Sequence, residues 1–153
     1  MKKKLFVLLA GLALAAAAQA QVAVTAPWIR ATVPQATSAG VFMRLQSAQD
    51  ARLVEVRSSA AGLAEIHQMA MDGQTMTMRA VNGIDLPAGK PVDLASGGLH
   101  IMLMDLKRQM KAGDSVPLTL LIQVKGKKPQ TLEVQVPVKP LTYVAPAPAA
   151  MVH

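Results

Sequence analysis

Two histidine–methionine steps carry the side chains that could do chemistry in this sequence. His67 is followed two residues later by Met69, and His100 is followed two residues later by Met102. The chain holds ten methionines, seven of them between residues 69 and 110, and no cysteine. Thioether sulfur is a soft, neutral ligand that suits Cu(I), and imidazole strengthens such a site without the tightness of thiolate. The donor set therefore predicts a copper site made of histidine and methionine.

The first step is expected to lie in a β-hairpin. Asp72-Gly73, flanked by strand-forming residues, favours a two-residue turn. With that loop, His67 faces Met78, and directly opposed Cβ atoms lie roughly 4.5–5.5 Å apart. A four-residue loop, Asp72–Thr75, moves the partners by two positions but leaves every side chain on the same face. In either case one face presents His67, Met69, Met76 and Met78.

The second step is expected to lie in a strand of its own. Alternate residues of a strand point the same way, so His100, Met102 and Met104 share a face. Folding then has only to bring the two strand ends together to form a site of two histidines and two methionines. A single strand histidine is more often a surface residue, and strand methionines mostly fill cores. We expect core or rim positions for Met43, Met71, Met104 and Met110, while Met151 and His153 are either tail residues or auxiliary ligands.

The rest of the chain predicts an all-β domain, because short apolar segments alternate with turn residues. No segment has a sustained helical period with caps at both ends. Val116–Val124 and Thr131–Val138 are expected to form a closing hairpin. The other expected strands are Gly40–Gln46, Leu53–Ser58, Ala64–Met71, Met76–Val81 and His100–Leu106.

The first twenty residues have the pattern of a cleaved signal peptide. Three lysines, Lys2–Lys4, precede the apolar run Leu5–Ala17 and the small-x-small step Ala18-Gln19-Ala20. The run is shorter than the roughly 20 residues of a membrane span. We therefore expect cleavage after Ala20 and export, with a bacterial periplasm as the destination. The expected organisation is a signal peptide over 1–20, one copper-binding domain over 21–142 and a flexible Pro/Ala-rich tail over 143–153.

The composition argues against several function classes. Loss of the leader lysines lowers the formal charge from +7 to +4, and the aromatic residues are one Trp, one Tyr and two Phe, too few for stacking bases. No membrane span is expected after leader cleavage. There is no cysteine nucleophile, no serine-hydrolase motif around either folded-region histidine and no zinc-hydrolase arrangement of ligands. We expect neither nucleic-acid binding nor enzymatic activity.

The spacing of four of these residues resembles that of the periplasmic PCu(A)C copper chaperones. His67, ten residues, Met78, twenty-one residues, then His100-x-Met102 match the H-x10-M-x21-H-x-M signature of that family. The segments around Trp28–Pro34, Gly97–His100 and Gly113–Leu118 are similar to the family as well, and the resemblance runs from about Val24 to Pro140.

The resemblance implies a single-domain, cupredoxin-like Greek-key β-barrel or sandwich and one Cu(I) bound by His67, Met78, His100 and Met102. It also implies delivery of copper towards the binuclear centre of cytochrome c oxidase, with subunit II and Sco-type thioredoxin-like proteins as partners. We expect a monomer. Blue-copper electron transfer needs a cysteine ligand, which this chain lacks.

Two other functions are compatible with the sequence. The same copper site could serve periplasmic buffering or resistance, with no dedicated acceptor. A metal-free β-sandwich could act in adhesion or assembly, and in that case changing His100 and Met102 to alanine would leave copper uptake unchanged. Fold and ligand set do not distinguish loading, storing and extracting copper.

Overall fold

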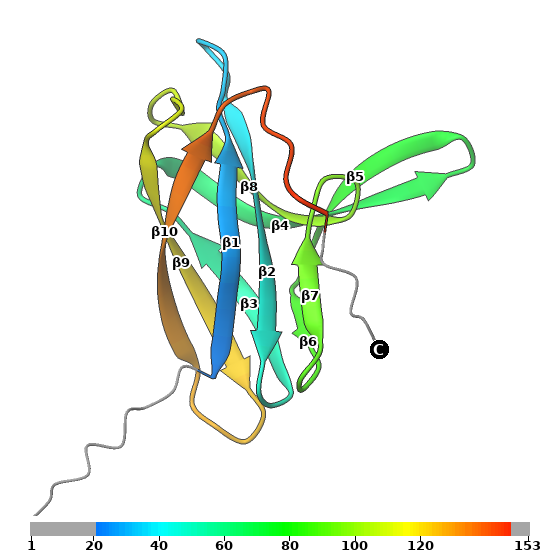
Figure 1. Ribbon diagram of the computed structural model, residues 1–153. Coiled ribbons are helices and arrows are strands. Elements are labelled where there is room, and N and C mark those ends of the chain that lie inside the picture. The colour runs from blue at the N-terminus through cyan, green and yellow to red at the C-terminus, as the bar shows by residue number, and fades with distance from the viewer. Residues whose placement is uncertain (1–20, 148–153) are drawn as a thin grey trace, which may run out of the picture.

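The computed structural model describes residues 21–147. Every regular secondary-structure element in this range is a β-strand (Figure 1). This confirms the expected all-β class. Ten strands are present: β1 Val22–Arg30, β2 Ser38–Ser47, β3 Ala51–Arg57, β4 Ala61–Asp72, β5 Thr75–Val81, β6 Ile84–Leu86, β7 Pro91–Leu94, β8 Leu99–Leu106, β9 Ser115–Val124 and β10 Gln130–Lys139. The expected signal peptide and the tail residues Met151 and His153 lie outside the described residues. Within residues 21–147, no helix is long and apolar enough to cross a membrane.

The strands form one continuous pairing path. Its order is β5-β4-β8-β2-β1-β10-β9-β3-β6, and β7 pairs with β2 beside the path. Neighbouring strands are antiparallel except β1 and β10, which pair in parallel through Ile29 opposite Val138. The expected closing hairpin is confirmed as the long antiparallel pairing of β9 with β10. Strands that are neighbours in the sheet, such as β2 and β8, are thus far apart in the sequence.

One hydrophobic core joins the two halves of this path. Along β9 the burial alternates strictly, so that Val116, Leu118, Leu120, Ile122 and Val124 all point inward. They belong to the same buried cluster as Leu45 of β2 and Ile101 of β8, which lie in the other half of the path. Each such side chain contributes about 1.5–3 kcal/mol when fully buried. The period-2 alternation then leaves the opposite, outer face of β2, β4 and β8 free for polar or functional side chains.

A β-bulge in β1 changes which side chains face outward. The register of β1 against β2 shifts between Thr25 and Trp28, and Ala26 has a positive φ of 49°. The extra residue reverses the alternation, as a bulge does. Ile29 consequently points into the core, while Trp28 pairs with Phe42 of β2 and stacks on it with ring centroids 4.7 Å apart.

The β4–β5 hairpin projects from the rest of the domain (Figure 1). The register of β4 with β8 ends at Gln68, opposite Leu99, and one further backbone hydrogen bond joins the Met69 N–H to the Gly98 oxygen. From Ala70 onward, β4 pairs with β5 alone. Six of the seven residues of β5 are exposed. This hairpin carries Met78, one of the two methionines predicted as copper ligands, together with Met69, Met71 and Met76.

Candidate metal centre

The two predicted histidine ligands come together on the outer face of the β4–β8 pair. The register of these strands places His67 directly opposite His100. Their ring centroids are 5.9 Å apart, with an angle of 61° between the ring planes. His100 is 5% exposed and the His67 side chain 12% exposed, so both imidazoles are shielded from bulk water. Their hydrogen bonds decide which ring nitrogens are free to bind a metal.

His67 offers its Nδ1 atom. Its Nε2 lies 2.8 Å from the Oε2 atom of Glu65, and an ionised carboxylate only accepts hydrogen bonds. Nε2 therefore carries the proton in neutral His67, and Nδ1 keeps its lone pair. Among the described residues, this Nδ1 is the buried side-chain nitrogen or oxygen that has no hydrogen-bond partner. A buried, unpartnered nitrogen is costly unless a ligand uses it, and a carboxylate that orients an imidazole is typical of metal sites.

His100 offers its Nε2 atom. Its Nδ1 lies 3.1 Å from the carbonyl oxygen of Gly98, and a carbonyl can only accept. Nδ1 must then donate, which leaves the lone pair on Nε2. In its neutral form, each histidine therefore has one nitrogen available, Nδ1 in His67 and Nε2 in His100. Neutral imidazoles with a free lone pair are the form in which histidine binds a metal.

Met102 lies beside this pair on the same face. It is two residues from His100 along β8, opposite Glu65 on one neighbouring strand and Gly40 on the other. A Cβ built at Gly40 would lie 2.9 Å from the Cζ atom of Phe42, so the glycine makes room for the aromatic ring. Met102 is partly buried. Its cross-strand neighbours are therefore Glu65 on β4 and, on β2, the glycine beside which the Phe42 ring lies.

Met78 takes a different place from the one expected with a turn at Asp72-Gly73. That register is wrong, because Met78 lies opposite Met69, and His67 lies opposite Ala80. The observed pairs are those expected for the four-residue loop Asp72–Thr75. The loop is nevertheless two residues long, because Asp72 and Thr75 also pair and only Gly73 and Gln74 lie between them.

The turn residue explains this register. Gly73 has a φ of 64°, and glycine is favoured where a two-residue turn needs a positive φ. Met78 remains on the face of His67, as a diagonal rather than a direct neighbour. It is 46% exposed, far more than either histidine.

The other methionines separate into two groups. Met43 and Met110 are buried in the core, as expected, at 3% and 0% exposure. Met71 is 62% exposed and lies opposite Met76. A core or rim position was expected for Met71, and the structure places it on the rim. Met104 is partly buried on β8, opposite Leu63.

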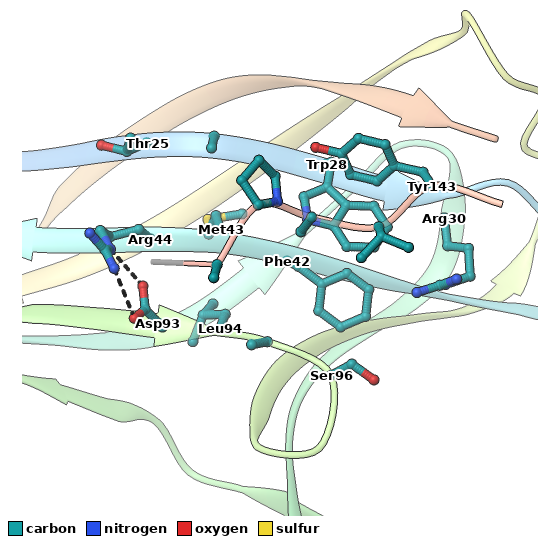
Figure 2. A pocket seen from close by; sticks show the side chains of 16 residues that line it. Thr25, Trp28, Arg30, Phe42, Met43, Arg44, Asp93, Leu94, Ser96 and Tyr143 are labelled. Atoms are coloured by element: carbon teal, nitrogen blue, oxygen red, sulfur yellow. Dashed lines mark hydrogen bonds and ion pairs between the residues drawn. The ribbon is translucent and has the colours of Figure 1, made fainter. Parts of the chain in front are cut away.

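An aromatic group that the sequence analysis did not single out adjoins the histidines. The ring of Phe42 lies 6.2 Å from that of His100, and Trp28 stacks on Phe42 from the far side. Tyr143, which we had assigned to the flexible tail, packs edge-on against Trp28 at 4.9 Å. These aromatics line a pocket of about 560 Å³ together with Met43, Leu94 and the chain at residues 144–147. Figure 2 shows the three aromatic side chains beside Met43 and Leu94. Phe42 therefore separates this pocket from the histidine pair.

Glu65, which contacts His67, is another residue near the site that was not expected from the sequence. The available signal was its spacing, because a residue two positions before His67 in a strand lies on the same face. Within the described part of the chain, no group of three or more His, Cys, Asp or Glu side chains could hold a metal ion. The register places Met69, Met78 and Met102 next to the imidazole pair on the same face. Their thioethers suit a soft ion such as Cu(I) better than a hard one.

Comparisons with known proteins are consistent with this architecture. The family model for LpqE-like lipoproteins matches residues 22–138. The chain is 34% identical over 119 residues to lipoprotein Lxx21020 of Leifsonia xyli subsp. xyli, covering 77% of this chain and 69% of that protein.

Solved structures show the same fold. The copper-bound PCuAC domain of PmoF2 has a TM-score of 0.64 and 23% identity, covering 79% of this chain and 94% of that domain. The Cu(I) form of DR1885 from Deinococcus radiodurans has a TM-score of 0.58 and 30% identity, covering 81% of this chain and 83% of that one. The expected cupredoxin-like fold is therefore confirmed. The chain belongs to the LpqE-like family, the PCuAC family that its sequence resembles.

Proposed function

We propose that this protein is an exported copper chaperone that binds one Cu(I) ion through His67, Met78, His100 and Met102. The observation that carries the proposal is the pair of opposed imidazoles, 5.9 Å apart, with the buried Nδ1 of His67 left without a partner. In each ring the second nitrogen is engaged by Glu65 or by the backbone of Gly98, which orients the free one.

The relatives support the choice of metal. The PmoF2 domain was solved with copper bound, and DR1885 was solved with Cu(I) bound. Because DR1885 shares 30% identity and most of its length with this chain, the same ion is the best candidate here. Two imidazoles and two thioethers would hold Cu(I) with neutral ligands, which matches a soft monovalent ion.

The unequal exposure of the ligands supports release by ligand exchange. Met78 lies on the projecting hairpin at 46% exposure, whereas His100 is 5% exposed. An acceptor could displace the Met78 thioether first and take up its place on the ion, while the buried imidazole still holds it. Copper would then pass between proteins without being released free. We propose the binuclear centre in subunit II of cytochrome c oxidase as the destination, with Sco-type proteins as partners.

We also propose that the protein works in the periplasm after loss of residues 1–20. The matching family and the Leifsonia relative are both named as lipoproteins, which supports a place in the cell envelope. Thioether ligands suit such an oxidising compartment because methionine forms no disulfides, although it can be oxidised to the sulfoxide.

An anaerobic Cu(I) titration of the chain without its leader, against a competing chelator, tests the binding claim. We expect a tight site of one ion. Loss of any one ligand should weaken Cu(I) binding by more than the loss of a residue that only hydrogen-bonds to a ligand, which typically costs roughly 10- to 100-fold. The variants that test this are His67→Ala, Met78→Ala, His100→Ala and Met102→Ala. Met104→Ala, on the same face of β8 as Met102, is the matched control and should leave the affinity unchanged. Indifference to all four ligand changes would contradict the proposal.

Deletion of the protein in its own host tests the direction of transfer. Delivery predicts loss of cytochrome c oxidase activity under copper limitation, restored by the unaltered protein but not by the His100→Ala variant. Sensitivity to excess copper with normal oxidase activity would instead indicate buffering by the same site.

A further inference from the structure

The β4–β5 hairpin carries a set of methionines that the proposed His67–His100 site does not use. Met69 lies opposite Met78, and Met71 lies opposite Met76, so two thioether pairs follow each other on one face. All four lie on the face of His67 because strand residues alternate. Met69, Met71 and Met76 are left without a role in the proposed function.

These side chains do not serve the core of the domain. Met71 is 62% exposed and Met76 47% exposed, and both lie where β4 pairs with β5 alone. The hairpin extends away from the body of the domain at this point (Figure 1). Long apolar side chains on an exposed hairpin contribute little to folding stability, which argues for a binding role.

The concentration of thioethers on a single face sets this hairpin apart. The opposite face carries polar or small residues in the same stretch: Gln68, Ala70, Asp72, Thr75, Thr77 and Arg79. A hairpin that only needed an apolar face would accept leucine, valine or isoleucine, and the β-branched residues favour strands more than methionine does. All the large side chains of this face nearest the turn are instead methionine.

The geometry allows three of these sulfurs to converge. Directly opposed Cβ atoms lie roughly 4.5–5.5 Å apart, and diagonal neighbours somewhat further. Met71 and Met76 are a direct pair, and Met69 is the diagonal neighbour of Met76 on the same face. Methionine has three rotatable bonds in its side chain, so the three sulfurs can turn towards one point above the hairpin.

We propose that Met69, Met71 and Met76 form a second Cu(I) site, made only of thioethers and weaker than the histidine site. The choice of Cu(I) rests on the softness of three neutral sulfur ligands, and it agrees with the proposed function without requiring it. The site adjoins the first one, because Met69 lies opposite the proposed ligand Met78. Exposure falls along this path, from 62% at Met71 to 46% at Met78 and 5% at His100.

Methionine methyl resonances provide the direct test. The full chain without its leader, with ¹³C-labelled methionine methyl groups, is titrated anaerobically with Cu(I) alone. The first equivalent should shift the methyl groups of Met78 and Met102. The second should shift those of Met69, Met71 and Met76 together, while the buried Met43 stays unchanged.

The double variant Met71→Leu/Met76→Leu removes two sulfurs and keeps the apolar surface of the hairpin. It should lose the second equivalent and keep the affinity of the first. Met104→Leu, on β8, is the matched control and should keep both equivalents. Unchanged thermal unfolding of the variants confirms that they fold.

Two results would overturn this second site: saturation at one equivalent in the unaltered protein, or a second equivalent that survives in the double variant. If the protein takes up one ion only and the leucine variant behaves identically, the hairpin face is not a metal site. Failure of the histidine site has a different signature, namely a first equivalent that does not depend on His67 or His100. The two proposals can therefore fail separately.

Discussion

His67 on β4 lies directly opposite His100 on β8, and the two residues are thirty-three positions apart in the sequence. Their rings are engaged on different nitrogens, Nε2 by the Glu65 carboxylate and Nδ1 by the Gly98 carbonyl oxygen. The free nitrogens are therefore Nδ1 of His67 and Nε2 of His100. Most consequences of the structure for copper binding follow from this pairing.

Glu65 should act as a positioning residue for His67. The variant Glu65→Gln keeps an oxygen acceptor but loses the charge, and Glu65→Ala loses the contact with Nε2 at 2.8 Å. We expect Glu65→Ala to weaken Cu(I) binding by about 10- to 100-fold and Glu65→Gln to retain most of the affinity. Chelator competition measures the affinities, and the ring resonances of His67 report whether its Nδ1 remains the free nitrogen. Equal affinities for the unaltered chain and Glu65→Ala would contradict this role.

Acid should weaken copper binding. Both imidazoles must be neutral to bind the metal, so protons compete with Cu(I) for the free nitrogens. Apparent affinity is expected to fall as the solution is brought from about pH 8 to about pH 5, the range in which histidine ordinarily titrates. An affinity that stayed flat over this range would count against imidazole ligation. The methionine-only site proposed for the hairpin would have no protonatable ligand and therefore serves as an internal comparison.

Gly40 should resist substitution because of Phe42. An added Cβ would lie 2.9 Å from Cζ and 3.3 Å from Cε2 of this ring, which is itself packed between Trp28 and His100. Gly40→Ala is expected to lower the free energy of unfolding by roughly 1–3 kcal/mol, as overpacking does. Urea unfolding measures the change.

Two further variants isolate the cause of that loss. Gly98→Ala is the control, because its nearest neighbour, the Ala95 oxygen, is 3.9 Å from an added Cβ. Phe42→Leu should relieve the clash, so the double variant Gly40→Ala/Phe42→Leu should lose less stability than the sum of the single changes. If Gly40→Ala stabilised the protein instead, the ring would not be confined as described.

The ion pair of Arg44 with Asp93 should add a small acid-sensitive contribution to stability. Two hydrogen bonds from the guanidinium, at 2.6 and 3.1 Å, hold the pKa of the Asp93 carboxyl below its ordinary value of 3.8 (Figure 2). Since the pKa is lower in the folded state, the stabilisation is present above that ordinary value and is lost as the pH falls through the folded pKa.

The variant Asp93→Asn tests this contribution. Both side chains are partly exposed, at 29% and 41%, so solvent screening keeps the effect small. Unfolding curves should show the variant slightly less stable at neutral pH, and the difference should vanish in strong acid. A difference that grew on acidification would show that the sign is wrong.

The sequence by itself determined the chemistry and the class of the fold. The histidine and methionine donors, the lack of cysteine and the strand alternation are local properties, which need no knowledge of the partners of each strand. Seven strands were expected and all seven are present, but β1, β6 and β7 were not among them. Two of these are only three and four residues long, and β1 is interrupted by the bulge at Ala26, so their apolar patterns are weak.

The same-face relation of His67 to the hairpin methionines also followed from the sequence. It holds for either turn, because a shift of two positions preserves the alternation. The expected turn at Asp72-Gly73 lies one residue before the observed turn at Gly73-Gln74, in which Gly73, with its positive φ, takes the first loop position.

Only the tertiary structure decided which groups meet across the site. Pairing of β4 with β8 depends on burying Ile66 and Ile101 in the common core, and this long-range register places His67 against His100. The engagement of Glu65 and the aromatic wall of Phe42 depend on the same register and on the bulge that turns Trp28 outward. Local sequence determines the face on which a strand residue lies, but its opposite neighbour is determined by the packing of the whole core, which no local pattern encodes.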